Sequence, residues 1–125
     1  MRENLKKLPE AELEVMQVLW GLEVPAPRAA VEEAMARVRP MAQTTLLTLL
    51  SRLAGKGFVR VEKQGRSSVY TPLVSREDYQ AQQSKRFVDR LFGGSMSAFA
   101  SALNASGIPK EDLDELRRLL EEGRL

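Results

Sequence analysis

Residues 44–59 read TTLLTLLSRLAGKGFV, and this stretch decides the fold of the chain. Its regularly spaced leucines lie on one helix face: Leu46, Leu49, Leu50 and Leu53. The helical pattern ends at the glycines that flank Lys56, and residues 58–62 (FVRVE) then have the β-branched and aromatic composition of a strand. The stretch therefore predicts a buried helix that passes through a glycine turn into a strand.

A β-hairpin is predicted to continue from that strand. Residues 68–71 (SVYT) form a second β-rich run, and residues 63–67 (KQGRS) lie between the two runs as a turn sequence that contains glycine. Pro72 closes the pattern. Two such runs around a short turn are typical of paired antiparallel strands.

Two amphipathic helices are predicted before residue 44, separated by a loop over residues 22–27 that contains two prolines. The first helix begins after Pro9 and ends at Gly21. The second is stopped by Pro40, because proline disfavours helical geometry in the residue before it. The apolar stripes are Leu13, Met16, Leu19 and Trp20 on the first helix, and Val31, Ala34, Met35 and Val38 on the second.

Three further helical patterns follow the hairpin. Ser75 begins the first with a sequence that resembles a capping box, and a glycine pair at residues 93–94 ends it. Ser95 can cap the second helix, and Pro109 precedes the third. The boundary between the hairpin and these helices is placed at residues 73–74.

Three helices followed by a basic hairpin are the element order of a winged helix-turn-helix, so the expected fold is mainly α with a small β-hairpin wing. In this fold the third helix lies in the major groove of DNA, and the wing lies against the backbone or the minor groove. We expect a DNA-binding head over residues 1–73 and a helical dimerisation region over residues 74–125. The alternative is a winged-helix protein-interaction module without sequence-specific DNA binding.

The outer face of the third helix has the chemistry of a DNA-reading surface. Opposite the leucines, a helical wheel places small hydroxylated residues, which let the helix approach DNA closely and bond to phosphates or base edges. An ordinary exposed face is the alternative, although threonine is a poor helix former. The predicted contacts here are Thr44, Thr45, Leu47, Thr48, Ser51 and Arg52.

Basic residues are concentrated around the same helix and hairpin. Residues 37–66 contain seven basic side chains and one acidic one, although the net charge of the whole chain is only +2. Such a patch is typical of phosphate binding, with a merely solvated basic face as the alternative. At the hairpin tip the predicted DNA contacts are Lys63, Arg66 and Ser67, with Ser68 beside them.

Few of these contacts are charged, so one head would bind DNA weakly, and a dimer on a palindrome is expected. The C-terminal helices supply a candidate interface, because so short a segment rich in leucine and aromatic residues can hardly close a core alone. Packing back on the head of the same chain is the alternative. The predicted interface residues are Tyr79, Phe87, Leu91, Phe92, Met96, Phe99, Leu103, Leu113, Leu116 and Leu120.

Composition excludes several other classes of function. The chain has no cysteine and no histidine, which excludes disulfides, thiolate chemistry, zinc sites and Ser-His-Asp triads. The acidic run of residues 111–115 is explained as the charged first turn of the last helix. No apolar run approaches the ~20 residues of a membrane span, and the N-terminus lacks the apolar core of a signal peptide. We expect a cytoplasmic protein that is not an enzyme and has no cofactor, metal, membrane insertion or small-molecule substrate.

Three separated segments resemble the penicillinase repressor family, the winged-helix regulators of β-lactamase and methicillin-resistance genes. They are residues 11–21 (AELEVMQVLWG), residues 44–59 as quoted above and residues 87–96 (FVDRLFGGSM). The resemblance runs from Leu8 to Leu120.

The resemblance implies a bacterial, nucleoid-associated homodimer that binds palindromic operator DNA with TACA/TGTA-type half-sites and blocks transcription. Thr44, Thr45 and Leu47 match positions that face the groove in the family, and the C-terminal helices match its intertwined dimer interface. Repression in the family ends when a β-lactam-type signal acts through a sensor protease system that leads to C-terminal cleavage. The bond that matches the cleavage site is Ala102–Leu103. A related branch senses copper through C-terminal cysteines, which this chain lacks.

Overall fold

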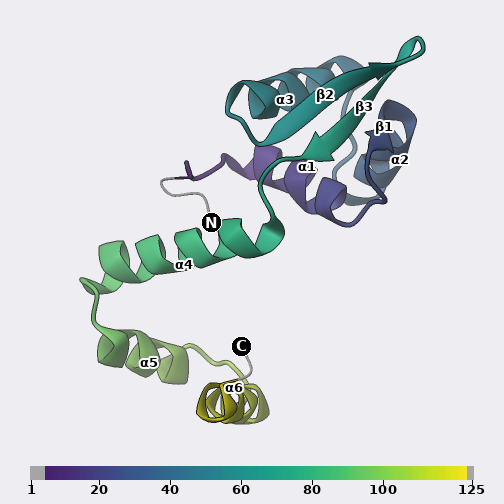
Figure 1. Ribbon diagram of the computed structural model, residues 1–125. Helices are drawn as coiled ribbons and strands as arrows, with labels where there is room; N and C mark the ends of the chain where they lie inside the picture. Colours follow the sequence, from purple (N-terminus) through teal and green to yellow (C-terminus); the bar gives the residue numbers. More distant parts are fainter. Residues whose placement is uncertain (1–4, 124–125) are drawn as a thin grey trace. The chain divides into compact units, whose positions relative to one another are not determined.

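Helices α1 (Glu10–Trp20), α2 (Arg28–Val38) and α3 (Gln43–Gly55) form the N-terminal part of the chain together with a three-stranded antiparallel sheet (Figure 1). The strands β1 (Ala26–Pro27), β2 (Val59–Gln64) and β3 (Ser67–Pro72) lie in the order β1-β3-β2. The computed structural model describes residues 5–123. The predicted fold class, mainly α with a small β-hairpin wing, is confirmed.

The leucine face of α3 points inward, as its spacing predicts. Leu46, Leu49, Leu50 and Leu53 are all buried where α3 packs against α1 and β2. Full burial of one leucine side chain contributes about 1.5–3 kcal/mol, so these leucines leave only one favourable rotation of the helix about its axis. This rotation places the opposite face of α3 in solvent.

The hairpin is longer, and its turn tighter, than the sequence predicts. Strands β2 and β3 pair continuously up to Gln64 opposite Ser67, so only Gly65 and Arg66 remain in the turn. Gly65 has φ +66°, a left-handed conformation that glycine adopts readily and that suits a two-residue hairpin turn. Lys63, predicted as a turn residue, lies on β2 instead.

Strand β1 corrects the prediction of a loop over residues 22–27. Ala26 pairs with Tyr70 and Pro27 with Val69 at the edge of the sheet, where proline is tolerated. A two-residue strand has no periodicity that a sequence pattern could show. Its pairing depends on a partner far along the chain, so only the tertiary structure reveals it.

The apolar stripes of α1 and α2 are partly as predicted. The buried residues of the two helices are Glu12, Val15, Met16, Leu19, Val31 and Met35. Leu13, Trp20 and Ala34 are half-buried, and Val38, at the end of α2, is 61% exposed. Trp20 stays near the surface because its indole Nε1 donates a hydrogen bond of 2.9 Å to the carbonyl oxygen of Val74.

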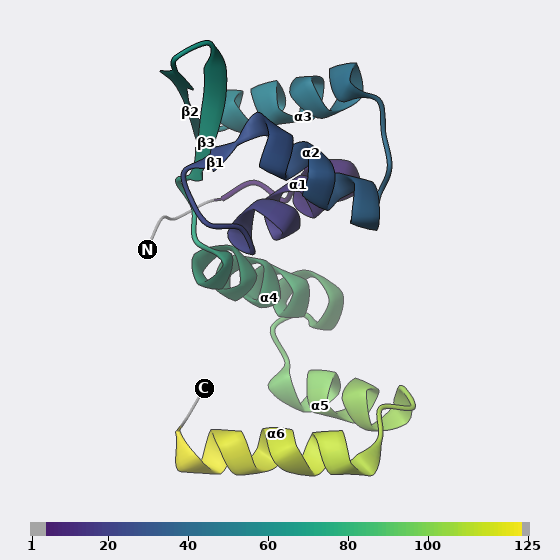
Figure 2. The same cartoon turned by 90° about the vertical axis from the view of Figure 1, so that its right-hand side faces the viewer.

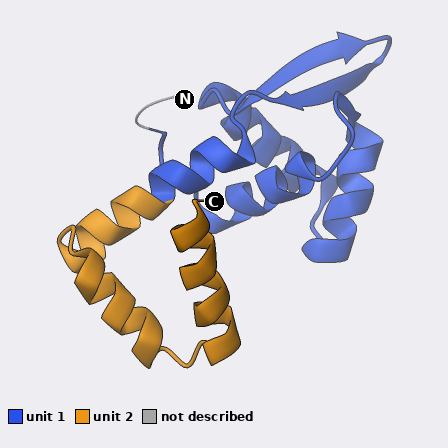
Figure 3. Ribbon diagram, turned by 60° about the horizontal axis from the view of Figure 1, so that its bottom comes forward, with its two compact units in different colours: residues 1–83 blue, residues 84–125 orange. Residues whose placement is uncertain are grey.

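Helix α4 (Arg76–Phe92) begins inside the N-terminal unit. The Tyr79 ring packs edge to face on Phe58, with ring centroids 5.8 Å apart. The chain therefore divides into units of residues 1–83 and 84–125 (Figure 3), which places the boundary later than the predicted residues 73–74. The sequence pattern marks where the hairpin ends, whereas the boundary depends on which turn of α4 the head still contacts.

The second unit contains the end of α4, helix α5 (Met96–Ala105) and helix α6 (Lys110–Glu122). The predicted cap is present at α5, where Ser95 Oγ accepts a hydrogen bond of 3.1 Å from the Ala98 backbone N–H. No residue from 84 to 123 is buried in the single chain. Among the described residues, no helix combines the length and the apolar character needed to cross a membrane.

Candidate nucleic-acid interface

The predicted DNA-reading face of α3 is accessible. Leu47 is half-buried, and the other predicted residues of this face are exposed: Thr44, Thr45, Thr48, Ser51 and Arg52. In the views of Figures 1 and 2, α3 and the β2–β3 hairpin lie at the same end of the N-terminal unit, and the hairpin tip extends beyond the helices. The structure therefore places α3 and the wing on one side of the head.

Thr48 differs from the other threonines in that its hydroxyl group is already engaged. Its Oγ1 donates a hydrogen bond of 3.0 Å to the backbone carbonyl of Thr44, one turn earlier. Thr48 therefore offers a nucleic acid its oxygen lone pairs and its methyl group, while the hydroxyls of Thr44 and Thr45 keep their donor capacity as well.

Ion pairs divide the basic residues of the 37–66 segment into two groups. Four are paired with carboxylates: Arg37 with Glu33 (2.8 Å), Arg39 with Glu14 (3.1 Å), Arg60 with Glu62 (3.1 Å), and Lys56 with Glu12. The remaining ones have no carboxylate partner among residues 5–123: Arg52, Lys63 and Arg66. These are the basic residues that the sequence predicts to contact DNA, and all are exposed.

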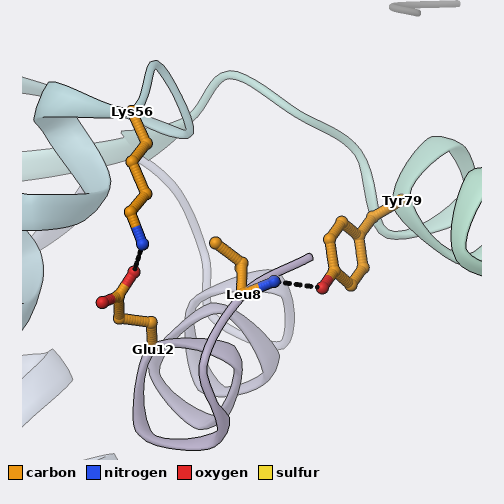
Figure 4. A network of polar contacts seen from close by, with 4 residues as sticks. All are labelled: Leu8, Glu12, Lys56 and Tyr79. Carbon is orange, nitrogen blue, oxygen red and sulfur yellow. Dashed lines mark hydrogen bonds and ion pairs between the residues drawn. The ribbon is translucent and has the colours of Figure 1, made fainter. Parts of the chain in front are cut away.

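Two glutamates of α1 neutralise cations on both flanks of α3. The Glu12 carboxylate, whose side chain is only 4% exposed, pairs with Lys56 immediately after α3 (Figure 4). Glu14 pairs with Arg39 in the turn before α3. These pairs connect α1 to the segments on either side of α3 and remove two free cations from the surface.

The role of Glu12 was not predicted from the sequence. A signal was nevertheless present, because Glu12 stands at the i position of an i, i+3, i+4, i+7 stripe whose other members are the buried Val15, Met16 and Leu19. A carboxylate on a buried stripe requires a cationic partner.

The C-terminal unit exposes large apolar side chains on each of its helices. Phe87 is 52% exposed, and Leu91 and Met96 are each 64% exposed. Leu116 and Leu120 are also exposed, whereas Phe92, Phe99, Leu103 and Leu113 are half-buried. A groove of about 450 Å³ between α5 and α6 is lined by Leu103, Leu113, Leu116 and Leu120, among others. An unburied apolar surface of this kind is typical of a protein interface.

Tyr79 is a correction to the predicted interface. Its side chain is 5% exposed and lies in the core of the N-terminal unit, against Phe58 and Trp20. Its hydroxyl oxygen accepts a hydrogen bond of 2.9 Å from the Leu8 backbone N–H (Figure 4). The position of Tyr79 on an amphipathic helix shows that it is buried, but not which unit buries it.

The predicted cleavage pair, Ala102 and Leu103, lies inside the regular helix α5, and both residues are half-buried. No group of metal-binding side chains occurs among the residues that the structure describes.

Comparison with known proteins gives a consistent result over nearly the whole chain. Residues 8–122 match the family model described as penicillinase repressor. The chain is 32% identical over 122 residues to the penicillinase repressor of Bacillus licheniformis, with 94% of each protein covered. It is 28% identical to the methicillin resistance regulatory protein MecI of Mammaliicoccus sciuri, with 91% of this chain and 93% of that protein covered.

Two solved structures resemble part of the chain. One is the DNA binding domain of the repressor BlaI, with a TM-score of 0.54 and 32% identity over 62% of this chain and 94% of that one. The other is the monomeric form of Bacillus licheniformis BlaI in complex with the blaP half-operator, with a TM-score of 0.51 and 33% identity over 61% of this chain and 92% of that one. These similarities confirm the winged-helix prediction.

Proposed function

This chain belongs to the penicillinase repressor family, and from this premise we propose that it is a transcriptional repressor that binds double-stranded operator DNA. Helix α3 enters the major groove and the wing lies against the phosphate backbone. The observation that carries this proposal is the division of the cations within residues 37–66. In this segment the exposed basic side chains without a carboxylate partner among the described residues are Arg52 of α3 and Lys63 and Arg66 of the wing. The proposed contacts are Thr44, Thr45, Leu47, Thr48, Ser51, Arg52, Lys63, Arg66 and Ser67.

The free cations predict how binding depends on salt. Each neutralised phosphate releases counterions and lowers the log-log slope of affinity against salt by about 0.9. Arg52, Lys63 and Arg66 give three phosphate contacts per head, which corresponds to a slope of about −5 for two heads. A cation held by a carboxylate within the protein contributes little to this slope, because its charge is already compensated.

We propose that sequence is read by the neutral side chains of α3. The hydroxyls of Thr44 and Thr45 donate to or accept from base edges, and the Leu47 side chain packs on thymine methyl groups. The relative solved with a half-operator supports a division in which each head reads one half-site.

A homodimer follows from the weakness of a single head. When two heads are linked, the second binding event becomes intramolecular and the total affinity can rise by about 10²–10⁴. The exposed apolar side chains of the C-terminal unit support an interface made by this unit. The proposed interface residues are Phe87, Leu91, Phe92, Met96, Phe99, Leu103, Leu113, Leu116 and Leu120.

Family membership further supports relief of repression by cleavage at Ala102–Leu103, after a β-lactam-type signal has reached a sensor protease system. A protease binds its substrate in an extended form, so α5 has to unwind locally before this bond can be cut. We place the repressor in the bacterial cytoplasm, on the nucleoid.

The test is a salt series of binding to a labelled palindromic TACA/TGTA duplex and to a scrambled duplex of the same composition, with the mass of the protein measured in parallel. The proposal predicts a dimer that prefers the palindrome, with the slope given above. Equal weak binding to both duplexes would contradict the assigned operator and call for unbiased selection of binding sites. Absence of binding to either duplex would support the protein-interaction alternative.

A further inference from the structure

The segment before α1 is hydrogen-bonded to the first turns of α4. The Leu5 backbone N–H donates a hydrogen bond of 2.8 Å to Gln82 Oε1, and the Leu5 carbonyl oxygen accepts one of 3.3 Å from Gln83 Nε2. The Leu8 backbone N–H donates a hydrogen bond of 2.9 Å to the Tyr79 hydroxyl oxygen. Both leucine side chains are buried. We call this set of contacts, between Leu5 and Leu8 on one side and Tyr79, Gln82 and Gln83 on the other, the N-terminal clip.

Other contacts hold the start of α4 to the rest of the head. The Trp20 and Tyr79 rings lie 6.0 Å apart between centroids, and the Trp20 indole bonds to the Val74 carbonyl just before α4 begins. These contacts end at the first turn of the helix, which starts at Arg76. The clip extends the attachment to Gln82 and Gln83, the last residues of the N-terminal unit.

The glutamines of the clip are not needed to form the proposed DNA-binding surface. The leucine face of α3 is buried by α1 and β2, and the wing is formed by β2 and β3. Gln82 and Gln83 are only half-buried, and the side-chain hydrogen bonds described above both join them to the main chain of Leu5. Their effect is therefore on how firmly α4 is attached, not on the shape of α3.

We propose that the N-terminal clip is a positioning device that limits which half-site spacings the repressor accepts. This inference rests on the proposed dimeric, DNA-binding function. Helix α4 is uninterrupted from Arg76 to Phe92, so a head attached to several of its turns leaves the helix pointing in one direction. A head attached only at the first turn could pivot about the connection before Arg76. A stiffer link raises the effective concentration of the second head at the matching spacing and lowers it at other spacings.

The test compares the wild-type chain with the Gln82→Ala/Gln83→Ala double variant. Gln80→Ala is the matched control, because Gln80 is exposed on the same helix and has no side-chain partner among the described residues. Affinity is measured for a half-site duplex, for the palindrome, and for palindromes with one or two base pairs inserted between the half-sites. Solution mass and thermal unfolding are measured for each variant.

The expected result has two parts. Half-site affinity changes by less than about twofold, while affinity for the best palindrome falls by about fivefold or more, a fraction of the gain from linkage. The penalty for inserted base pairs shrinks in the double variant and stays unchanged in the Gln80→Ala control. A general loss of stability would lower half-site and palindrome affinities together and would not flatten the spacing profile.

Two outcomes would overturn the inference, and they differ in what else they affect. If the double variant keeps the palindrome affinity and spacing profile of the wild type, the clip has no positioning role, and the proposed function stands. If the wild-type chain shows no preference for a palindrome over a half-site, the proposed dimeric function fails and the inference fails with it. Leu5→Ser, which keeps these backbone groups but removes the buried side chain that holds them beside Gln82 and Gln83, provides a second variant that must agree with the first.

Discussion

At the scale of single residues, the structure separates cations that are equivalent in composition. Arg60 and Arg66 belong to the same hairpin, but Arg60 is paired with Glu62, whereas Arg66 in the turn has no carboxylate partner among the described residues. An exposed ion pair is worth little to stability, about 0–1 kcal/mol, but it still decides which charge is available to a phosphate. Binding to phosphate therefore depends on which individual cations are unpaired, and not on the number of basic residues in the composition.

Replacement of Arg66 by alanine is expected to weaken binding to specific and scrambled duplexes by the same factor. One phosphate contact is lost per head, so the salt slope of the dimer should become shallower by about 1.8. Arg118→Ala is the control for net charge and should leave the slope unchanged, because Arg118 of α6 is also exposed and has no carboxylate partner among the described residues. Equal effects of the two substitutions would contradict a phosphate contact at the wing.

Thr45→Val is expected to act on specificity instead. Valine keeps the methyl groups and removes the hydroxyl, so a lost base-edge hydrogen bond should reduce discrimination at one base pair by about 1–3 kcal/mol. Affinities for a set of operators with single base-pair changes measure this effect. If discrimination falls evenly at all positions, Thr45 does not read a base.

At the scale of elements, a partly buried ion pair joins Glu12 of α1 to Lys56, the residue that follows α3, and its two side chains differ in exposure. The Glu12 side chain is 4% exposed, whereas that of Lys56 is 27% exposed. Removal of the lysine leaves a carboxylate in the core, but removal of the carboxylate leaves an ammonium group that can turn towards water. The two single substitutions should therefore have unequal costs.

We expect Lys56→Met to lower the free energy of unfolding by about 3 kcal/mol and Glu12→Gln by about 1–2 kcal/mol, because breaking a buried pair costs most when the group left behind cannot reach water. Denaturant unfolding of both variants gives the two values. A larger loss for Glu12→Gln would mean that the cation is the more buried partner.

Tyr79 connects α4 to the N-terminal segment, so Tyr79→Phe should affect stability and not association. The Leu8 backbone N–H would lose its acceptor at a buried site, at a cost of about 1–3 kcal/mol. Thermal unfolding and the monomer–dimer equilibrium are measured on the same variant. A weaker dimer with unchanged stability would restore Tyr79 to the interface.

At the scale of the whole molecule, the C-terminal unit has no buried residue in its described part, so a single chain leaves its apolar residues without a core. A second copy of the unit would cover them. In this respect the chain differs from an ordinary domain, whose largest apolar side chains are buried by its own fold.

A chain truncated after Gly94 is expected to remain a folded head that binds a half-site normally and a palindrome poorly. Loss of the linkage should reduce palindrome affinity by about 10²-fold or more, and the protein should have the mass of a monomer. Analytical ultracentrifugation with operator titrations tests both points. Undiminished binding to the palindrome would place the dimer interface elsewhere.

Patterns with a short period in the sequence predict much of the fold of this protein. The leucine spacing of α3 predicted which of its faces is buried, and hence that Thr44, Thr45 and Thr48 are exposed on the other. Gly21 and Pro40 predicted helix ends, and the cap at Ser95 was found where expected. In each case a local rule of backbone geometry or amphipathic burial is sufficient, because the residues involved lie within one or two turns of each other.

Contacts between residues that are far apart in the chain could not be predicted from such patterns. The pairing of Ala26 with Tyr70, the ion pair of Glu12 with Lys56 and the burial of Tyr79 all depend on contacts between residues more than forty positions apart. A one-dimensional pattern shows that a carboxylate or an aromatic ring lies on a buried stripe, but the partner is chosen by three-dimensional packing. The division of cations into paired and free ones follows from the same packing, and with it the surface proposed to meet DNA.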